Sequence, residues 1–318
     1  MKTWHVGSFK VTEIPEFPIA VGLLDGVIAE ATPDVVRGID WMRPDFANEQ
    51  GQTLWDVHSY VVDTGDQIIL IDGGCGNGKS YPMQPSWTDL DTPFLDRLTE
   101  AGYSPDDIDI LLCTHLHLDH IGWFSMKDSA GRWVPTFPHA RLVLVRDEYE
   151  RHLAQMLSPE DEESAAGAGA DDDPIARAFL ADSASLSKQT KLIQEETFDP
   201  IVEQGLLELV PTNAEVVPGV RYEQTLGHTA AHHSVRLSSE GRSAFVTGDF
   251  IHHPMQIARP EWSSQGDWDG ATTGRNRRAF FEAAAGTDLL ILGTHFTGAG
   301  AGYIVEDGEG FRLANAPA

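Results

Sequence analysis

The sequence predicts an α/β chain made of two pseudo-duplicated halves, with a helical region inserted between them. Apolar segments at 58–63 and 67–72 flank the turn-forming residues Thr-Gly-Asp, a pattern that predicts a β-hairpin. Segments at 232–237 and 243–247 predict a second hairpin of the same plan. In both halves an aspartate follows the returning strand, and this repetition relates the two halves to each other.

The other elements fit a single domain over residues 1–318. Residues 3–14 alternate between apolar and polar side chains, as in a half-buried strand. Residues 158–174 are acidic and small and lack periodicity, which is typical of a mobile surface loop or a plain solvated connector. Helical patterns on both sides of this stretch predict a helical insertion over residues 142–205 that could cap a site.

Composition and charge narrow the classes of partner. The chain has 22 Lys and Arg against 49 Asp and Glu, a net charge of −27. A field of this sign repels nucleic acid and anionic membranes, so we expect neither as a partner. Cys75 and Cys113 lie in or beside apolar stretches, which predicts two reduced thiols. With no signal-peptide pattern and no apolar run of roughly 18 residues, the expected location is cytoplasmic.

The strongest motif follows the strand-like residues 108–113 and has the pattern His-x-His-x-Asp-His. Its four potential metal ligands are His115, His117, Asp119 and His120. In an extended turn the first three project to one side, while the leucines between them anchor the other side. The last histidine enters the next helix. This spacing can supply ligands to two adjacent metal ions.

Three further candidate ligands each follow a predicted strand. They are His228, Asp249 and His295. Because the carboxyl ends of strands in an α/β sheet share one edge, where ligand sites form, these residues can join the motif there. The sequence therefore predicts a site of five histidines and two aspartates.

These seven residues resemble the metallo-β-lactamase superfamily, whose His-x-His-x-Asp-His motif and later His, Asp and His are matched at every position. The resemblance spans about residues 55–305 and implies an αββα sandwich with a dinuclear metal site at one edge. The segments at 135–144 and 247–254 are similar to the branch that holds N-acyl homoserine lactonases, organophosphate hydrolases and isothiocyanate hydrolases.

The resemblance also implies a role for each ligand. One metal would be held by His115, His117 and His228, the other by Asp119, His120 and His295, with Asp249 bridging them. The expected cofactor is two Zn²⁺ per chain, with Mn, Fe or Co open on ligand type. A bridging water would act as the nucleophile, and Asp119 would pass a proton to the leaving group.

Other residues are expected to support the site or line its pocket. Asp72 resembles a carboxylate that orients a ligating histidine, and His232 is predicted to be a buried supporting group because the ligand set is already full. Several side chains near the ligands in sequence are candidates for the wall of an apolar pocket. They are Trp123, Phe124, His252, His253, Met255, Trp262, Trp268 and Phe296. Core packing, or a hydrogen-bonded structural role for the histidines, remains the alternative.

The function that fits these observations is a dinuclear metal-dependent hydrolase. The expected substrate is a small, neutral and fairly apolar ester, lactone or phosphotriester, and a homodimer is compatible with the resemblance. Two alternatives stay open: a mononuclear iron oxidoreductase similar to persulfide dioxygenases, and a glutathione-thioester hydrolase similar to glyoxalase II.

Overall fold

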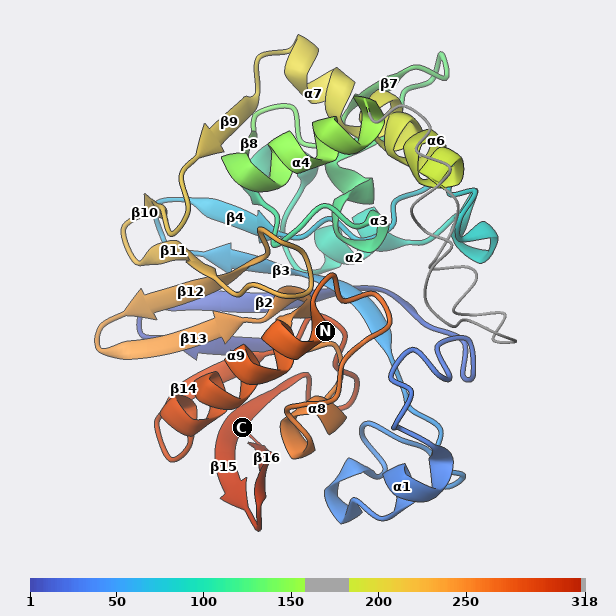
Figure 1. Cartoon of the computed structure of the whole chain (residues 1–318). Coiled ribbons are helices and arrows are strands. Elements are labelled where there is room, and N and C mark those ends of the chain that lie inside the picture. The colour runs from blue at the N-terminus through green and yellow to red at the C-terminus, as the bar shows by residue number, and fades with distance from the viewer. Residues whose placement is uncertain (158–182, 316–318) are drawn as a thin grey trace.

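The computed structural model describes residues 1–157 and 183–315, so the acidic stretch predicted at 158–174 lies outside the described residues. It contains two seven-stranded sheets and a small two-stranded one (Figure 1). The first large sheet has the strand order β1-β2-β3-β4-β5-β8-β9. Its strands are β1 (Thr3–Val6), β2 (Phe9–Pro18), β3 (Asp56–Asp63), β4 (Ile68–Ile71), β5 (Ile110–Leu112), β8 (Arg141–Val145) and β9 (Leu207–Val210).

The second large sheet follows directly along the chain and has the order β10-β11-β12-β13-β14-β15-β16. Its strands are β10 (Glu215–Val217), β11 (Val220–Gln224), β12 (His233–Ser239), β13 (Arg242–Val246), β14 (Leu289–Leu292), β15 (Ala301–Asp307) and β16 (Gly310–Asn315). The two-stranded sheet pairs β6 (Ser125–Lys127) with β7 (Trp133–Pro135).

The two large sheets repeat one local topology, which confirms the predicted pseudo-duplication. In the first, the β3–β4 hairpin is antiparallel and β5 adds to β4 in parallel. In the second, the β12–β13 hairpin is antiparallel and β14 adds to β13 in parallel. Parallel neighbours must be joined by a crossover connection. The loops that follow β4 and β13 therefore occupy equivalent positions, each at the carboxyl end of its strand.

The core follows from alternation along the strands. Ile69 and Ile71 of β4 join an apolar cluster shared with Val235 and Val246 of the other sheet, whereas Leu70 joins the cluster under the helices. This period of two gives each sheet one face toward its partner sheet and one toward a helical layer.

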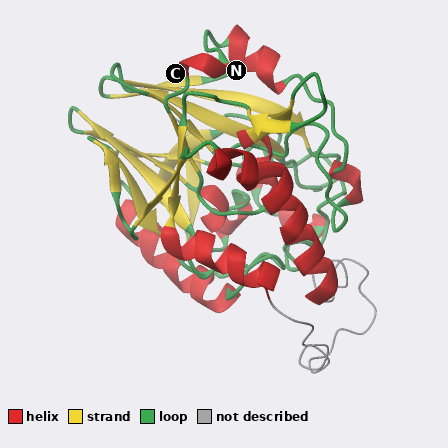
Figure 2. Cartoon of the chain, turned by 90° about the horizontal axis from the view of Figure 1, so that it is seen from above, coloured by secondary structure: helices red, strands yellow, loops and turns green. Residues whose placement is uncertain are grey.

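Helices cover the outer faces of both sheets, giving αββα layering (Figures 1 and 2). The described α-helices are α1 (Pro33–Arg37), α2 (Phe94–Glu100), α3 (Leu118–Ile121), α4 (Arg146–Leu157), α6 (Ser183–Ile193), α7 (Asp199–Glu203), α8 (Met255–Ala258) and α9 (Gly270–Ala284), of which α1 lies apart from the sheets (Figure 1). A π-helical turn at Gln194–Phe198 joins α6 to α7. Among the described residues, no helix is both long and apolar enough to cross a membrane.

The region predicted as an insertion differs at its start. Residues 142–145 belong to β8, which pairs in parallel with β5 as part of the first large sheet. The helical part of the region begins at Arg146, because the apolar residues before it are buried in the sheet.

Candidate metal centre

The loop after β5 carries the His-x-His-x-Asp-His motif, and hydrogen bonds to Asp72 hold the start of this loop in place. Asp72 follows β4 and has a left-handed backbone, with φ of 60°. Its carboxylate accepts hydrogen bonds from the backbone nitrogen of Thr114 at 2.8 Å and from the Thr114 hydroxyl at 3.0 Å. An unusual backbone conformation of this kind persists where surrounding contacts require it, and functional sites are common places for it.

A close backbone approach sets the position of α3. Gly122, at the end of that helix, donates a hydrogen bond from its backbone nitrogen to the carbonyl oxygen of Gly74 at 2.7 Å. A Cβ atom on Gly122 would lie 1.8 Å from the carbonyl oxygen of Cys75, so no larger residue fits there without moving the loop. The loop after β4 and the motif helix are therefore locked together.

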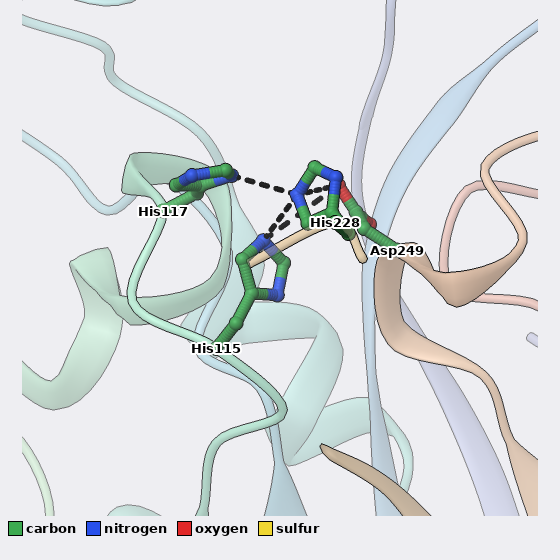
Figure 3. Close-up of side chains that lie close together, drawn as sticks. All are labelled: His115, His117, His228 and Asp249. Carbon is green, nitrogen blue, oxygen red and sulfur yellow. Dashed lines mark hydrogen bonds and ion pairs between the residues drawn. The ribbon is translucent and has the colours of Figure 1, made fainter. Parts of the chain in front are cut away.

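Four of the predicted ligands form a first cluster, in which the side chains of His115, His117, His228 and Asp249 converge (Figure 3). The Nε2 atom of His228 lies 3.1 Å from Nε2 of His115 and 2.9 Å from Nδ1 of His117. Oδ2 of Asp249 lies 3.3 Å from Nε2 of His228. The four ligand atoms all lie within 4.8 Å of one another, close enough to share one metal ion.

Hydrogen bonds on the far side of the rings fix which nitrogen faces the centre of this cluster. Nδ1 of His228 lies 3.0 Å from Oδ1 of Asp267, and because a carboxylate accepts, the imidazole donates. Nδ1 of His115 lies 3.1 Å from the Thr114 hydroxyl, whose own hydrogen goes to Asp72. Both Nε2 atoms are then left as lone pairs pointing at each other, an arrangement that a cation between them would stabilise.

The other three predicted ligands form a second cluster, of Asp119, His120 and His295. Oδ1 of Asp249 lies 3.3 Å from Nε2 of His120 and 3.1 Å from Nε2 of His295. Asp249 thus points one carboxylate oxygen at each cluster, which is the geometry of a bridging ligand. Nε2 of His120 and Oδ1 of Asp249 are buried and make no hydrogen bond among the described residues, so both are free to bind a metal.

The second cluster is oriented in the same way as the first. Nδ1 of His120 donates to Oδ2 of Asp72 at 3.0 Å, and Nδ1 of His295 donates to the carbonyl oxygen of Asp56 at 2.8 Å. Each of these rings therefore presents Nε2 to the cluster. Imidazole and carboxylate donors in this number fit divalent zinc, manganese, iron or cobalt.

Burial and mutual repulsion keep the histidines of the first cluster neutral. Burial lowers the pKa of His115 well below its usual value, and the neighbouring His120 and His117 lower it further. Burial raises the pKa of Asp249, but the charges of His120, His252 and His295 outweigh this and hold that pKa well below its usual value. Neutral imidazole and ionised carboxylate are the forms that bind metal ions.

The predicted supporting residues lie where a supporting role requires, and one such residue was not predicted. Asp72 contacts His120 as described above, and His232 accepts a hydrogen bond at Nε2 from the backbone nitrogen of Asp249 at 3.0 Å. Asp267, which accepts a hydrogen bond from His228, is not predicted from the sequence, because its loop carries no periodicity or motif that separates it from the chain's other aspartates. Its only sequence signal is the short turn-forming run of Ser, Gln and Gly before it.

Most of the predicted pocket residues lie in the core, not around a cavity. Trp123 stacks on Phe94 with ring centroids 5.1 Å apart and donates from Nε1 to a carboxylate oxygen of Glu16 at 2.7 Å. His253 donates from Nε2 to the carbonyl oxygen of Phe46 at 2.9 Å. Fully or nearly buried side chains are also found at Phe124, Met255 and Phe296, and Trp262 packs against the same core. Nearness to a ligand in sequence does not fix which way a side chain turns.

Two of these candidates are exceptions: Trp268 lines a cavity, and His252 adjoins the first cluster. Its Nε2 atom lies 3.3 Å from Oδ2 of Asp249, and its ring centroid lies 4.6 Å from that of His228. Its Nδ1 atom is buried and has no hydrogen bond among the described residues.

A cavity of about 140 Å³ opens beside the first cluster. Its lining includes His117 and His228 of the cluster, Arg151 and Gln155 of α4, and Trp268. The Arg151 guanidinium lies 5.7 Å from the centroid of the exposed Trp268 ring. The lining is more polar than the aromatic wall predicted from the sequence.

Comparison with known proteins agrees with this geometry. Residues 53–295 match the family described as Metallo-beta-lactamase superfamily. The N-acyl homoserine lactonase AiiB of Agrobacterium fabrum is 30% identical over 106 residues, covering 29% of this chain and 34% of that protein. The N-acyl homoserine lactonase AiiA of Bacillus thuringiensis subsp. kurstaki is 23% identical over 196 residues, covering 58% and 59%. The matches thus span about one third to three fifths of these relatives' length.

Two solved structures share the fold over nearly the whole chain. AidC, a dizinc quorum-quenching lactonase in complex with a product, has a TM-score of 0.73 at 20% identity and covers 100% of this chain and 97% of its own. The hydrolase AbOPH has a TM-score of 0.74 at 22% identity, with 99% and 97% covered. Because the family match covers most of the chain and the predicted ligands converge within it, the chain belongs to the metallo-β-lactamase superfamily.

Proposed function

We propose that the protein is a metal-dependent hydrolase that opens a lactone or cleaves a related ester. The observation that carries this proposal is the pair of ligand clusters joined by Asp249, whose two oxygens face opposite clusters. The curated relatives are named as N-acyl homoserine lactonases and one structural neighbour as a dizinc lactonase, which supports the lactone as substrate.

The proposed ligand sets follow the two clusters. His115, His117 and His228 would hold one metal ion, Asp119, His120 and His295 the other, and Asp249 would contact both. When bound, two such ions polarise a carbonyl oxygen and lower the pKa of bound water toward about 7. We propose zinc for both positions, because nitrogen and oxygen donors in this number suit it.

The protein's own groups hold this arrangement rigid. The hydrogen bonds to Asp72, Asp267 and the Asp56 carbonyl keep three imidazole rings from rotating. A catalytic group held in this way does not spend binding energy on reorganisation during the reaction.

Asp119 is the proposed proton carrier. Its carboxylate oxygens lie 3.8 Å from Nε2 of His120 and 3.6 Å from Nε2 of His295. Its side chain is 15% exposed, whereas that of His120 is fully buried. This position beside the second cluster, together with its partial exposure, supports a role in which Asp119 passes a proton to the leaving group.

The cavity beside the first cluster is the proposed place for the part of the substrate that does not react. It adjoins His117 and His228, so a substrate whose carbonyl lies at the cluster would extend toward Arg151, Gln155 and Trp268. His252, against Asp249, would contact the reacting end. No feature among the described residues favours a single-iron oxidoreductase, which would leave one of the two clusters without use.

The proposal is tested by metal content and activity measured on the same preparation. We expect about two zinc ions per chain by elemental mass spectrometry. We also expect hydrolysis of lactones at neutral pH, measured through the proton that each hydrolysis releases. A panel of lactones, aryl esters and phosphotriesters would rank the substrates. One iron per chain, with oxygen consumed in the presence of a thiol persulfide and no lactone hydrolysis, would refute the proposal.

A further inference from the structure

A loop between α8 and α9 wraps around the ligand His228 and carries a buried carboxylate to it. The side chain of Asp267 in this loop is fully buried. Its Oδ1 atom accepts a hydrogen bond from Nδ1 of His228 at 3.0 Å, and its Oδ2 atom accepts one from the backbone nitrogen of Ser264 at 3.1 Å. Both carboxylate oxygens are therefore used, and one of them reaches a proposed metal ligand directly.

The same loop also binds the backbone of the ligand. The backbone nitrogen of Trp268 donates to the carbonyl oxygen of His228 at 2.9 Å, and that of Asp269 donates to the carbonyl oxygen of Gly227 at 2.8 Å. Side chain and backbone of His228 are thus held by one short stretch of chain. A movement of this stretch would move the ligand with it.

Arg277 of α9 holds this loop in place through contacts with two of its residues. Its side chain is fully buried, its Nη1 atom donates to the carbonyl oxygen of Trp262 at 2.7 Å, and its Nη2 atom lies 3.7 Å from Oδ2 of Asp267. Gly274, one turn earlier, lets the loop come close: a Cβ there would lie 3.1 Å from Cα of Glu261. The guanidinium supplies the positive charge that a buried carboxylate needs.

The first half of the chain uses the same device. There, the buried Asp72 accepts a hydrogen bond from Nδ1 of His120, which belongs to the other cluster. Each cluster thus contains one histidine whose far nitrogen is held by a buried carboxylate. Such a partner fixes the ring and raises the basicity of the nitrogen that binds metal.

We propose that Asp267, fixed by Arg277, is a positioning residue that sets the metal affinity of the cluster formed by His115, His117 and His228. This inference rests on the proposed function in one respect, that the cluster binds metal. It adds the loop of Asp267 and helix α9 to the residues that the sequence motifs assign to the metal centre. It also implies that the metal affinity of one cluster can be changed without changing that of the other.

The test compares two substitutions that remove different properties of Asp267. Asp267→Asn keeps an oxygen that accepts the Nδ1 hydrogen of His228 but removes the charge, whereas Asp267→Ala removes both. Each variant is titrated with Co²⁺ and Zn²⁺, and the Co²⁺ absorption spectrum is recorded at one and two equivalents. We expect Asp267→Ala to bind one metal about 10- to 100-fold more weakly than the native protein and the second metal unchanged. Asp267→Asn should lie between the two.

Arg277 and its neighbour provide a matched pair. Arg277→Met should weaken the same single metal, whereas Arg278→Met should change nothing, because Arg278 is an exposed residue that pairs with Glu261 on the surface. Thermal unfolding of the metal-free proteins separates loss of metal affinity from loss of fold. If Asp267→Ala does not fold, the affinity and Co²⁺ spectrum of Asp267→Asn decide the question.

Failure of this inference differs from failure of the proposed function. A native protein that binds two metals, with Asp267 variants that bind both with native affinity and native Co²⁺ spectra, would overturn the role of Asp267 alone. A native protein that binds no metal at all would overturn both.

Discussion

The Nδ1 atom of His117 lies 2.9 Å from the Nε2 atom of His228, although the other ring nitrogen of His228 already donates its hydrogen to Asp267. Two ring nitrogens at this distance repel each other when both present lone pairs. A proton or a metal ion between them turns the repulsion into attraction, and Asp249 on the same side supplies the negative charge that favours a divalent ion.

Removing metal should therefore abolish activity and lower stability together. A chelator is expected to stop lactone hydrolysis and to reduce the melting temperature. When the free metal concentration is a thousand times the Kd, metal binding adds about 4 kcal/mol to the free energy of unfolding. Calorimetry with and without chelator, followed by return of Zn²⁺, measures this. Full activity and an unchanged melting temperature after the metal has been removed would contradict it.

Asp119→Asn should remove proton transfer while leaving the fold intact. We expect kcat to fall about 10²- to 10⁴-fold, the usual contribution of a positioned acid or base. Steady-state kinetics and far-ultraviolet circular dichroism check the two parts. Asp106→Asn, at a surface turn where the side chain is 73% exposed, is the control and should behave as the native protein. Native turnover in the Asp119 variant would remove it from the mechanism.

Arg151→Met should weaken substrate binding more than it slows turnover. Arg151 lines the cavity and is not one of the proposed metal ligands, so its loss should raise KM about 10- to 100-fold, the value of one hydrogen bond to a charged group, with kcat little changed. Arg146→Met on the same helix is the control, because Arg146 forms an exposed pair with Glu150. Equal KM values in the two variants would show that the substrate does not occupy this cavity.

The buried His253 should make the protein less stable in acid. Burial lowers the pKa of His253 to about 3, from an ordinary value near 6.5. Between these two values the unfolded chain binds a proton that the folded chain does not, so stability is complete above pH 6.5 and falls as the pH drops toward 3. At pH 5 the loss from this residue is about 2 kcal/mol.

His253→Gln keeps one donor and one acceptor but does not titrate, so its unfolding free energy should fall less steeply between pH 7 and 5. Urea unfolding at several pH values measures the slope. His5→Gln, at an exposed position, should keep the native slope. A native slope in the His253 variant would show that the pKa of His253 is not lowered in the fold.

Much of the fold could be predicted because it is encoded locally. Alternation along residues 58–63 and 67–72 predicts the β3–β4 hairpin, and the structure places those strands within two residues of the expected bounds. The seven ligand candidates can also be predicted from local patterns, because four of them form one motif after a strand, three each follow a strand of their own, and strand ends share an edge. The start of α4 was harder, since the apolar residues before it suit a strand and a helix equally.

The parts that could not be predicted depend on which way a side chain turns. Trp123 lies three residues after a predicted ligand, yet the turn after α3 directs it into the core against Phe94 and Glu16. Asp267 lies 39 residues after His228, and only the folded path of its loop brings the two together. Sequence spacing contains no information on contacts of this kind.

Each ligand cluster takes residues from both halves of the chain, which has a consequence for folding. His117 and His228, joined through one metal ion, are 111 residues apart in sequence. A bound ion is then a reversible cross-link between the two halves, and unlike a disulfide it forms only where the folded chain has already brought its ligands together. Without metal, this link between the two halves is absent. We then expect proteases to cut the chain faster between Val210 and Glu215, where the chain passes from one sheet to the other.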